Sequence, residues 1–197
     1  PDSEIAGSGE WLDLVLAHEL THVFTLNAGS PPFRLARRLF GTNPVFFPAA
    51  QLPPWVIEGL AIQGESRLSG NGRLNRAPYR LMLDAARREG TFPGWRSLAG
   101  SPLDWPGGAA KYLFGAGFME FLAGKHGAAA PRRYLQRFSS RLLTLGTSRD
   151  FRKLFGKPLG ELWQEYREGR GAPRRPAIEP LTKDGFANRY PCVLAGG

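Results

Sequence analysis

Cysteine is almost absent from this chain, because Cys192 is the only one among 197 residues. A single cysteine excludes an intramolecular disulfide, so the hydrophobic core must hold the fold together. Long apolar runs are also missing, since no stretch approaches the about 18 consecutive apolar residues that a membrane-spanning helix requires. The sequence therefore predicts a globular domain with one sizeable core and no membrane-spanning helix.

Acidic residues are scarce relative to basic ones: 17 Asp and Glu stand against 26 Lys and Arg, which gives a net charge of +9. Such an excess can indicate a nucleic-acid-binding protein. Here the basic residues are spread over several expected helices, and no recognition helix, zinc knuckle or aromatic stacking platform accompanies them. We therefore expect solvated basic helix faces and no nucleic-acid partner. Attraction to an anionic cell-envelope surface is the other use of this charge.

A secretory signal is missing too, because Pro1 is not followed by a charged start and an apolar segment. We expect the chain to be processed or cut from a longer protein. The 17 prolines and 25 glycines predict short helices joined by well-punctuated loops.

Histidine is equally scarce, yet two of the three histidines stand four residues apart in His18-Glu19-Leu20-Thr21-His22. Residues at this spacing share one face of an α-helix, so both imidazoles can point at one metal ion. Neutral imidazoles suit zinc. Glu19, one position beyond the first ligand, is placed to reach a metal-activated water as general base. The pattern predicts the metal-binding helix of a zinc peptidase.

A histidine pair at this spacing can also be a surface accident or a buried, hydrogen-bonded pair. The flanking residues predict a helix that is apolar on most sides and therefore buried. Burying two imidazoles and a carboxylate is costly without a partner, and a metal ion would supply one. The apolar residues of this expected helix are Trp11, Leu12, Leu14, Val15, Leu16, Leu20, Val23 and Phe24.

A third ligand is expected from the apolar stretch Pro54 to Ala61, which contains Glu58. A lone glutamate in such a helix usually faces water, but a catalytic zinc site needs three protein ligands and an open position. The metzincin pattern is excluded, because Thr25 stands where it needs glycine and Ala28 where it needs a third histidine.

The two motifs, His18-Glu19-Leu20-Thr21-His22 and Pro54-Trp55-Val56-Ile57-Glu58-Gly59-Leu60-Ala61, resemble those of gluzincins, in particular the bacterial peptidase MA-like families. The resemblance covers roughly residues 10–170. It implies a zinc ion held by His18, His22 and Glu58, with Glu19 as general base for peptide-bond hydrolysis. It further implies a peptide or protein substrate and an extracytoplasmic location, in the periplasm or cell envelope.

Four further positions carry expectations. By the resemblance, Tyr112 would stabilise the oxyanion, while a tyrosine on an apolar helix is more often part of the core. Glu65, two turns beyond Glu58, would either support a metal ligand or face solvent. His126 is expected at a helix end and not as a ligand. The run Gly115-Ala116-Gly117 predicts the close approach of another helix.

We expect a mainly α, zincin-like (gluzincin) catalytic domain in residues 1–170. The family's N-terminal β-sheet would be largely absent, because little precedes Trp11. Helices are expected at residues 9–26, 31–40, 54–66, 77–88, 107–125, 131–143, 151–155 and 158–168. The apolar loop 42–52 would cover the core, line a substrate cleft or touch a membrane. Residues 171–197 would be a linker and the possible start of a β domain, similar to the entry of a TolB-like propeller.

A function of another class stays open. The chain could be a non-catalytic binding or scaffold module of the cell envelope, with a structural metal site and a propeller as its working part. Chelator-sensitive cleavage of a protein substrate discriminates between the two functions.

Overall fold

The computed structural model describes residues 11–70, 72–100, 105–141 and 147–169. This part of the chain is mainly α-helical and contains no β-strand, which confirms the expected class. None of its helices is both long and apolar enough to cross a membrane. The helices are α1 (Trp11–Leu26), α2 (Pro31–Phe40), α3 (Pro54–Ser69), α4 (Ala77–Arg88), α5 (Ala110–His126), α6 (Ala130–Phe138), α7 (Thr147–Phe155) and α8 (Leu159–Glu168).

The helix boundaries differ from expectation mainly at α6, which ends at Phe138, five residues before the expected end. The hydroxyls of Ser139 and Ser140 donate to the carbonyls of Leu135 and Arg137 at 2.7 and 2.8 Å. These bonds satisfy carbonyls of the last turn and so favour an end there. The expectations for residues 1–10 and 171–197 lie outside the described residues.

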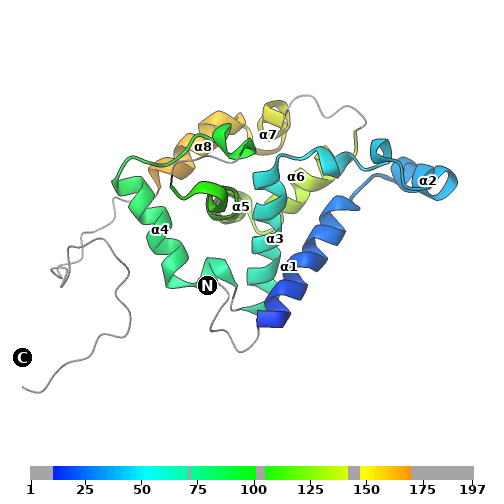
Figure 1. The fold of residues 1–197 in the computed structure, drawn as a ribbon. Coiled ribbons are helices and arrows are strands. Elements are labelled where there is room, and N and C mark those ends of the chain that lie inside the picture. Colours follow the sequence, from blue (N-terminus) through cyan, green and yellow to red (C-terminus); the bar gives the residue numbers. More distant parts are fainter. Residues whose placement is uncertain (1–10, 71, 101–104, 142–146, 170–197) are drawn as a thin grey trace, which may run out of the picture.

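Helix α3 is the centre of the fold, with α1 packed along one side and α5 crossing it on another (Figure 1). Its buried Trp55 belongs to an aromatic cluster in which Phe118 of α5 and Trp163 of α8 touch one another and the indole of Trp55. In the loop after α2, Pro48, Ala49 and Leu52 are buried, so this part of the loop covers the core.

The α3–α5 crossing depends on two glycines. A Cβ on Gly115 would lie 2.2 Å from the carbonyl oxygen of Trp55, and a Cβ on Gly59 would lie 2.6 Å from the backbone of Gly115. Neither neighbour can move aside without shifting a helix. The close approach expected from the small residues of α5 is therefore confirmed.

Gly115→Ala is expected to lower the free energy of unfolding by about 1–3 kcal/mol, the usual effect of overpacking. Gly124→Ala is the matched control in the same helix, because a Cβ there meets nothing within 4 Å. It should stabilise the protein by about 0.5–1 kcal/mol through helix propensity. Urea denaturation followed by circular dichroism measures both. Equal stability of the two variants would contradict the close crossing.

The outer face of α1 is exposed, so the expectation of a helix buried on most sides is wrong. Leu14, His18 and Thr25 are its buried residues, and α3 and the 3-10 turn Pro48–Gln51 (η2) are its main neighbours in the described structure. Hydrophobicity around a helix does not determine how many neighbours cover it. The large apolar residues that α1 exposes are Trp11, Leu12, Leu16, Leu20, Val23 and Phe24.

Candidate metal centre

The crossing of α1 and α3 brings the two sequence motifs together. A Cβ on Gly64 of α3 would lie 2.4 Å from the hydroxyl oxygen of Thr21, so a glycine is needed for α1 to come this close. His18 and His22, one turn apart, lie on the α3-facing part of α1, and Glu58 faces them from the second turn of α3. Helical spacing and one tight contact thus assemble the site.

Three potential ligand atoms converge there. The Nε2 atoms of His18 and His22 are 3.1 Å apart, and the Oε2 atom of Glu58 lies 3.5 and 3.3 Å from them. Among the described residues, these three side chains form a group that could hold a metal ion. The structure therefore brings together all three ligands expected from the sequence.

The Oε2 atom of Glu58 is buried and has no hydrogen-bond partner among the described residues. Its other oxygen, Oε1, lies 3.7 Å from Nζ of Lys111. Burial alone would raise the pKa of Glu58, but His18, His22, Lys111 and the Tyr112 hydroxyl outweigh it and lower the pKa. An ionised carboxylate with one unsatisfied oxygen between two imidazole nitrogens is the donor set that a cation completes.

Glu65 holds His18 from the far side of its ring. Its Oε2 atom lies 3.2 Å from Nδ1 of His18 and 2.7 Å from Nη2 of Arg73, and the side chain is fully buried. The backbone N–H of Arg73 also donates to Glu65 at 3.0 Å. Burial would raise the pKa of Glu65, but the hydrogen bonds from His18 and Arg73 lower it to about 2. The expectation that Glu65 faces solvent is therefore wrong, whereas its support of a metal ligand stays a prediction that its contact with His18 favours.

The tautomer of His18 follows from these contacts. Nη2 of Arg73 also lies 2.9 Å from Nδ1, but a guanidinium only donates, so Nδ1 either donates to Glu65 or accepts from Arg73. Donation to Glu65 leaves Nε2 with the bare lone pair that a metal needs. The Nδ1–H tautomer is therefore the one in which His18 could bind a metal through Nε2. Burial lowers the pKa of His18, but Glu58 and Glu65 outweigh it, so the pKa is raised above its ordinary 6.5.

Sequence reasoning missed Arg73 and Lys111, which surround the site with positive charge. Nζ of Lys111 lies 5.0 Å from the ring centroid of Tyr112, and Cζ of Arg73 lies 5.8 Å from the same centroid. No local pattern marks either cation. If Glu65 is buried, its carboxylate needs a cationic partner, and this need is the one signal that could have pointed to Arg73.

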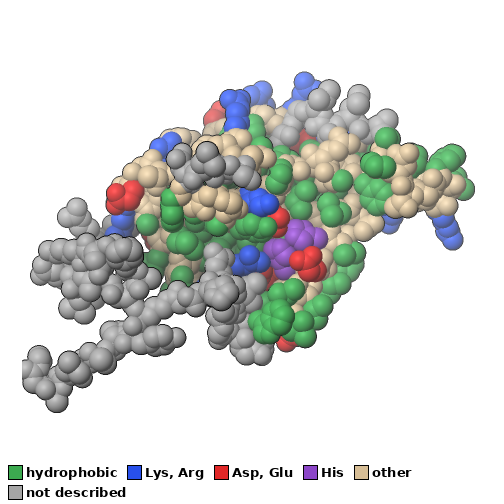
Figure 2. Space-filling view, in the orientation of Figure 1, with side chains coloured by type: hydrophobic (Ala, Val, Ile, Leu, Met, Phe, Trp, Pro, Cys, Tyr) green, Lys and Arg blue, Asp and Glu red, His purple; other side chains and the backbone are tan. Residues whose placement is uncertain are grey.

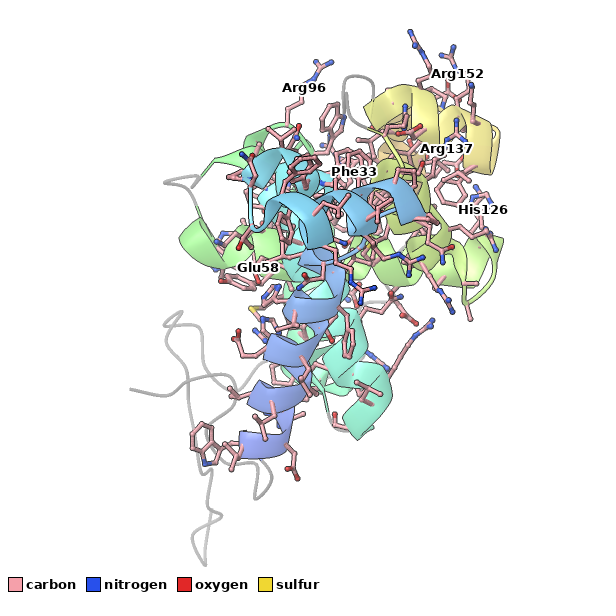
Figure 3. The ribbon with its side chains drawn as sticks, turned by 90° about the vertical axis from the view of Figure 1, so that its right-hand side faces the viewer. Phe33, Glu58, Arg96, His126, Arg137 and Arg152 are labelled. Atoms are coloured by element: carbon pink, nitrogen blue, oxygen red, sulfur yellow. The ribbon has the colours of Figure 1, made fainter. Side chains whose placement is uncertain are left out.

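The other expected residues divide between the site and the rest of the molecule. Tyr112 lies beside the site, where its hydroxyl helps to lower the pKa of Glu58, and its side chain also packs against the core. Glu19 is exposed on α1, one residue after His18. Figure 2 shows His side chains reaching the surface beside acidic and basic groups. His126 ends α5 and lies across the molecule from Glu58 (Figure 3), so it is not a ligand.

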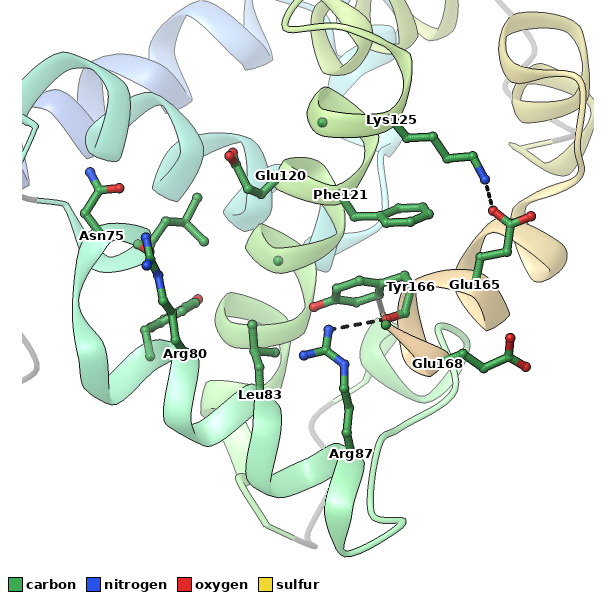
Figure 4. A pocket seen from close by; sticks show the side chains of 15 residues that line it. Asn75, Arg80, Leu83, Arg87, Glu120, Phe121, Lys125, Glu165, Tyr166 and Glu168 are labelled. Atoms are coloured by element: carbon green, nitrogen blue, oxygen red, sulfur yellow. Dashed lines mark hydrogen bonds and ion pairs between the residues drawn. The ribbon is translucent and has the colours of Figure 1, made fainter. Parts of the chain in front are cut away.

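A cavity of about 770 Å³ lies elsewhere, between α4, α5 and α8 (Figure 4). Arg87 is one of the residues that line it, and its guanidinium donates to Asp84 at 3.1 Å and to the Tyr166 carbonyl at 3.3 Å. None of the metal-site residues lines it. The candidate metal centre and this cavity are therefore separate features.

Glu65→Gln is expected to weaken metal binding about 10–100-fold, the usual effect of losing a residue that orients a metal ligand. It should also change the pH dependence. Because His18 has a raised pKa, protons compete with the metal at pH values above 6.5, and affinity should fall as the pH drops through that range. Removing Glu65 removes one cause of the raised pKa, so the fall should begin at lower pH. Zinc titration against a chelating dye between pH 5 and 8 measures both effects.

Glu89→Gln serves as the control, because Glu89 is an exposed glutamate outside the metal site. It should leave zinc affinity and its pH profile unchanged. An unchanged pH profile in Glu65→Gln would contradict the assigned link between Glu65 and the Nδ1 atom of His18.

Comparison with known proteins finds one relative among curated proteins. It is a protein of Treponema pallidum (strain Nichols), described as uncharacterized, that is 29% identical over 181 residues. These residues are 90% of this chain but 15% of the relative, so the chain spans a small part of that protein's length. No family model matches the chain, and no solved structure matches it. The gluzincin resemblance therefore stays a proposal.

Proposed function

We propose that this chain is a zinc metallopeptidase domain of gluzincin type, with a zincin-like helical arrangement. The observation that carries the proposal is the spacing of His18 Nε2, His22 Nε2 and Glu58 Oε2, which lie 3.1–3.5 Å from one another. Zinc ligands at about 2.0–2.1 Å in a tetrahedral arrangement are about 3.3 Å apart. Two imidazoles and one carboxylate also form a common catalytic zinc set with one open position.

The protein's own residues have distinct tasks in this proposal. His18, His22 and Glu58 would hold the ion, and Glu65 with Arg73 would fix the ring of His18. Zinc, when bound, would lower the pKa of a water molecule and polarise the scissile carbonyl. Glu19 would take the proton of the attacking water and return it to the leaving amine. Tyr112 would donate to the oxyanion that develops on the carbonyl.

The Tyr112 role is supported by its position beside Glu58, whose pKa its hydroxyl helps to lower. Lys111, 3.7 Å from the outer oxygen of Glu58, would favour one-oxygen binding by that carboxylate and so keep the remaining position open. We further propose a peptide or protein substrate and an extracytoplasmic location, both from the family resemblance. A C-terminal propeller in a longer protein belongs to the same proposal.

One observation favours a second candidate, the non-catalytic cell-envelope module with a structural metal site. Extended peptide substrates are often held by pairing with an edge strand. The described residues include no strand that could do this. A chain with an intact metal site and no means of aligning a peptide would bind zinc without turnover.

Cleavage of casein and of a mixed peptide library, with and without a chelator, tests the proposed function. The metallopeptidase predicts cleavage that stops on chelation and returns when zinc is restored. Stoichiometric zinc without any cleavage would favour the non-catalytic module and contradict the proposed activity.

A further inference from the structure

Helix α2 is built differently from the rest of the fold. It is the one α-helix in the described part of the chain that contributes no buried residue, and it projects at one end of the molecule (Figure 1). Its contacts are chiefly with the neighbouring 3-10 turn Pro44–Phe46 (η1). Because α2 adds no buried residue to the core, core packing does not explain its apolar residues.

One side of α2 is fixed to the body by a few defined contacts. The guanidinium of Arg37 donates to the carbonyl of Asn27 at 3.0 Å and lies 4.7 Å from the ring centroid of Phe47. The rings of Phe40 and Phe46 lie 6.1 Å apart. These contacts orient α2, so the opposite side is held outward.

That opposite side carries two parallel rows of one residue type each. Leu35 and Leu39 are 56% and 67% exposed, and the neighbouring Arg34 and Arg38 are exposed as well. Each pair is spaced by four residues, which aligns it along one helix face. Phe40 is also exposed, but its ring lies on the Phe46 side of the helix and is not part of these rows. Figure 2 shows apolar and basic side chains gathered at this end of the molecule.

We propose that this α2 face, formed by Arg34, Leu35, Arg38 and Leu39, binds the surface of an anionic lipid bilayer. The helix would lie in the plane of the interface, with its leucines among the upper acyl chains and its arginines at the phosphates. Adjacent apolar and arginine rows are the signature of such interfacial helices. The ten residues of α2 include three arginines and no acidic residue, and the whole chain carries +9.

The charge of the α2 face also favours a membrane over a second copy of the chain as its partner. In a symmetric pair of copies the same patch meets itself, so Arg34 and Arg38 of both molecules would bring four positive charges into one interface without an acidic partner from α2. Like charges brought together in such an interface repel one another and oppose association. Anionic headgroups, in contrast, attract each arginine and leave room for the leucines between them. The same face is thus unfavourable for self-association and favourable for an anionic membrane.

Sedimentation with lipid vesicles tests this assignment. The 197-residue chain should bind phosphatidylcholine vesicles that contain about one third phosphatidylglycerol, and bind pure phosphatidylcholine at least about tenfold more weakly. The double variant Leu35→Gln/Leu39→Gln should lose about tenfold in binding. Arg34→Glu/Arg38→Glu should lose about thirtyfold or more, and added salt should weaken the wild type.

Matched controls exist elsewhere on the surface. Leu68 and Leu81 are 74% and 66% exposed, so Leu68→Gln/Leu81→Gln changes the same residue type outside α2. Arg132→Glu/Arg152→Glu reverses two exposed arginines of α6 and α7. The leucine control should bind within about twofold of wild type, and the arginine control should lose much less than the α2 pair. Circular dichroism and zinc content verify that every variant is folded.

Three outcomes would overturn the proposal. The first is absence of binding to the anionic vesicles, and the second is equal loss in the α2 variants and their controls. The third is a dimer in light scattering that the leucine variant abolishes, which would assign this face to contact between copies.

Discussion

Replacing Glu19 with Gln should abolish measurable peptide hydrolysis while zinc content stays at about one ion per chain. General-base catalysis contributes about 10²–10⁴-fold to a hydrolytic rate, so kcat should fall by at least that factor. Glutamine keeps the size of the side chain and its place on α1 but cannot take a proton from water. Glu19 is exposed and is not one of the three converging ligands, so its loss should leave the metal in place.

The measurement combines kcat from a fluorogenic peptide with zinc analysis of the same preparation. Asp13→Asn is the control, because Asp13 is another exposed carboxylate of α1. It should retain wild-type activity. Loss of zinc in the Glu19 variant would show that Glu19 is a ligand and that its role is misassigned. Full activity with zinc retained would exclude it as the base.

The second large effect is expected from the ligands themselves. His22→Ala and Glu58→Gln should each weaken zinc binding by at least about a hundredfold, because each removes one protein donor from a site whose binding energy is shared among few ligands. Hydrolysis should disappear with the metal. Zinc should also raise the thermal midpoint of these variants much less, since a ligand that binds only the folded state stabilises it by an amount that grows with the logarithm of its affinity.

His126→Ala is the matched control for both variants. His126 is the remaining histidine of the chain and lies at the end of α5, where its ring packs at a tilt against Phe155, with ring centroids 4.9 Å apart. It should bind zinc with wild-type affinity and keep activity. Undiminished zinc binding in His22→Ala would remove His22 from the site, and the proposed ligand set would then be wrong.

The three residues of the candidate metal site could be predicted from the sequence because much of their geometry is local. The spacing of His18 and His22 specifies a shared helix face wherever the helix lies. Glu58 followed from the number of ligands that zinc needs and from the resemblance of its flanking residues. The run of small residues around Gly115 likewise predicted a close helix contact. It could not identify Trp55 as the partner, because that contact joins residues far apart in the chain.

The surroundings of the site could not be predicted, since they depend on tertiary packing. Arg73 reaches Glu65 from a short 3-10 turn after α3, and Lys111 reaches Glu58 from the start of α5. Neither position has a periodic or motif signal. For α1, in contrast, the sequence predicted more burial than the structure has. Its hydrophobic residues predict that a neighbour is favourable, but they do not say whether one is present.

X-ray absorption spectroscopy of the zinc-loaded protein tests the central claim most directly. The proposed site predicts about one zinc per chain in a four-coordinate shell of nitrogen and oxygen at about 2.0–2.1 Å, with the outer-shell scattering of two imidazoles. The third protein donor should be a carboxylate that disappears from the spectrum in Glu58→Gln. A shell with one imidazole or none, an octahedral oxygen shell, or substoichiometric zinc would contradict a site formed by His18, His22 and Glu58.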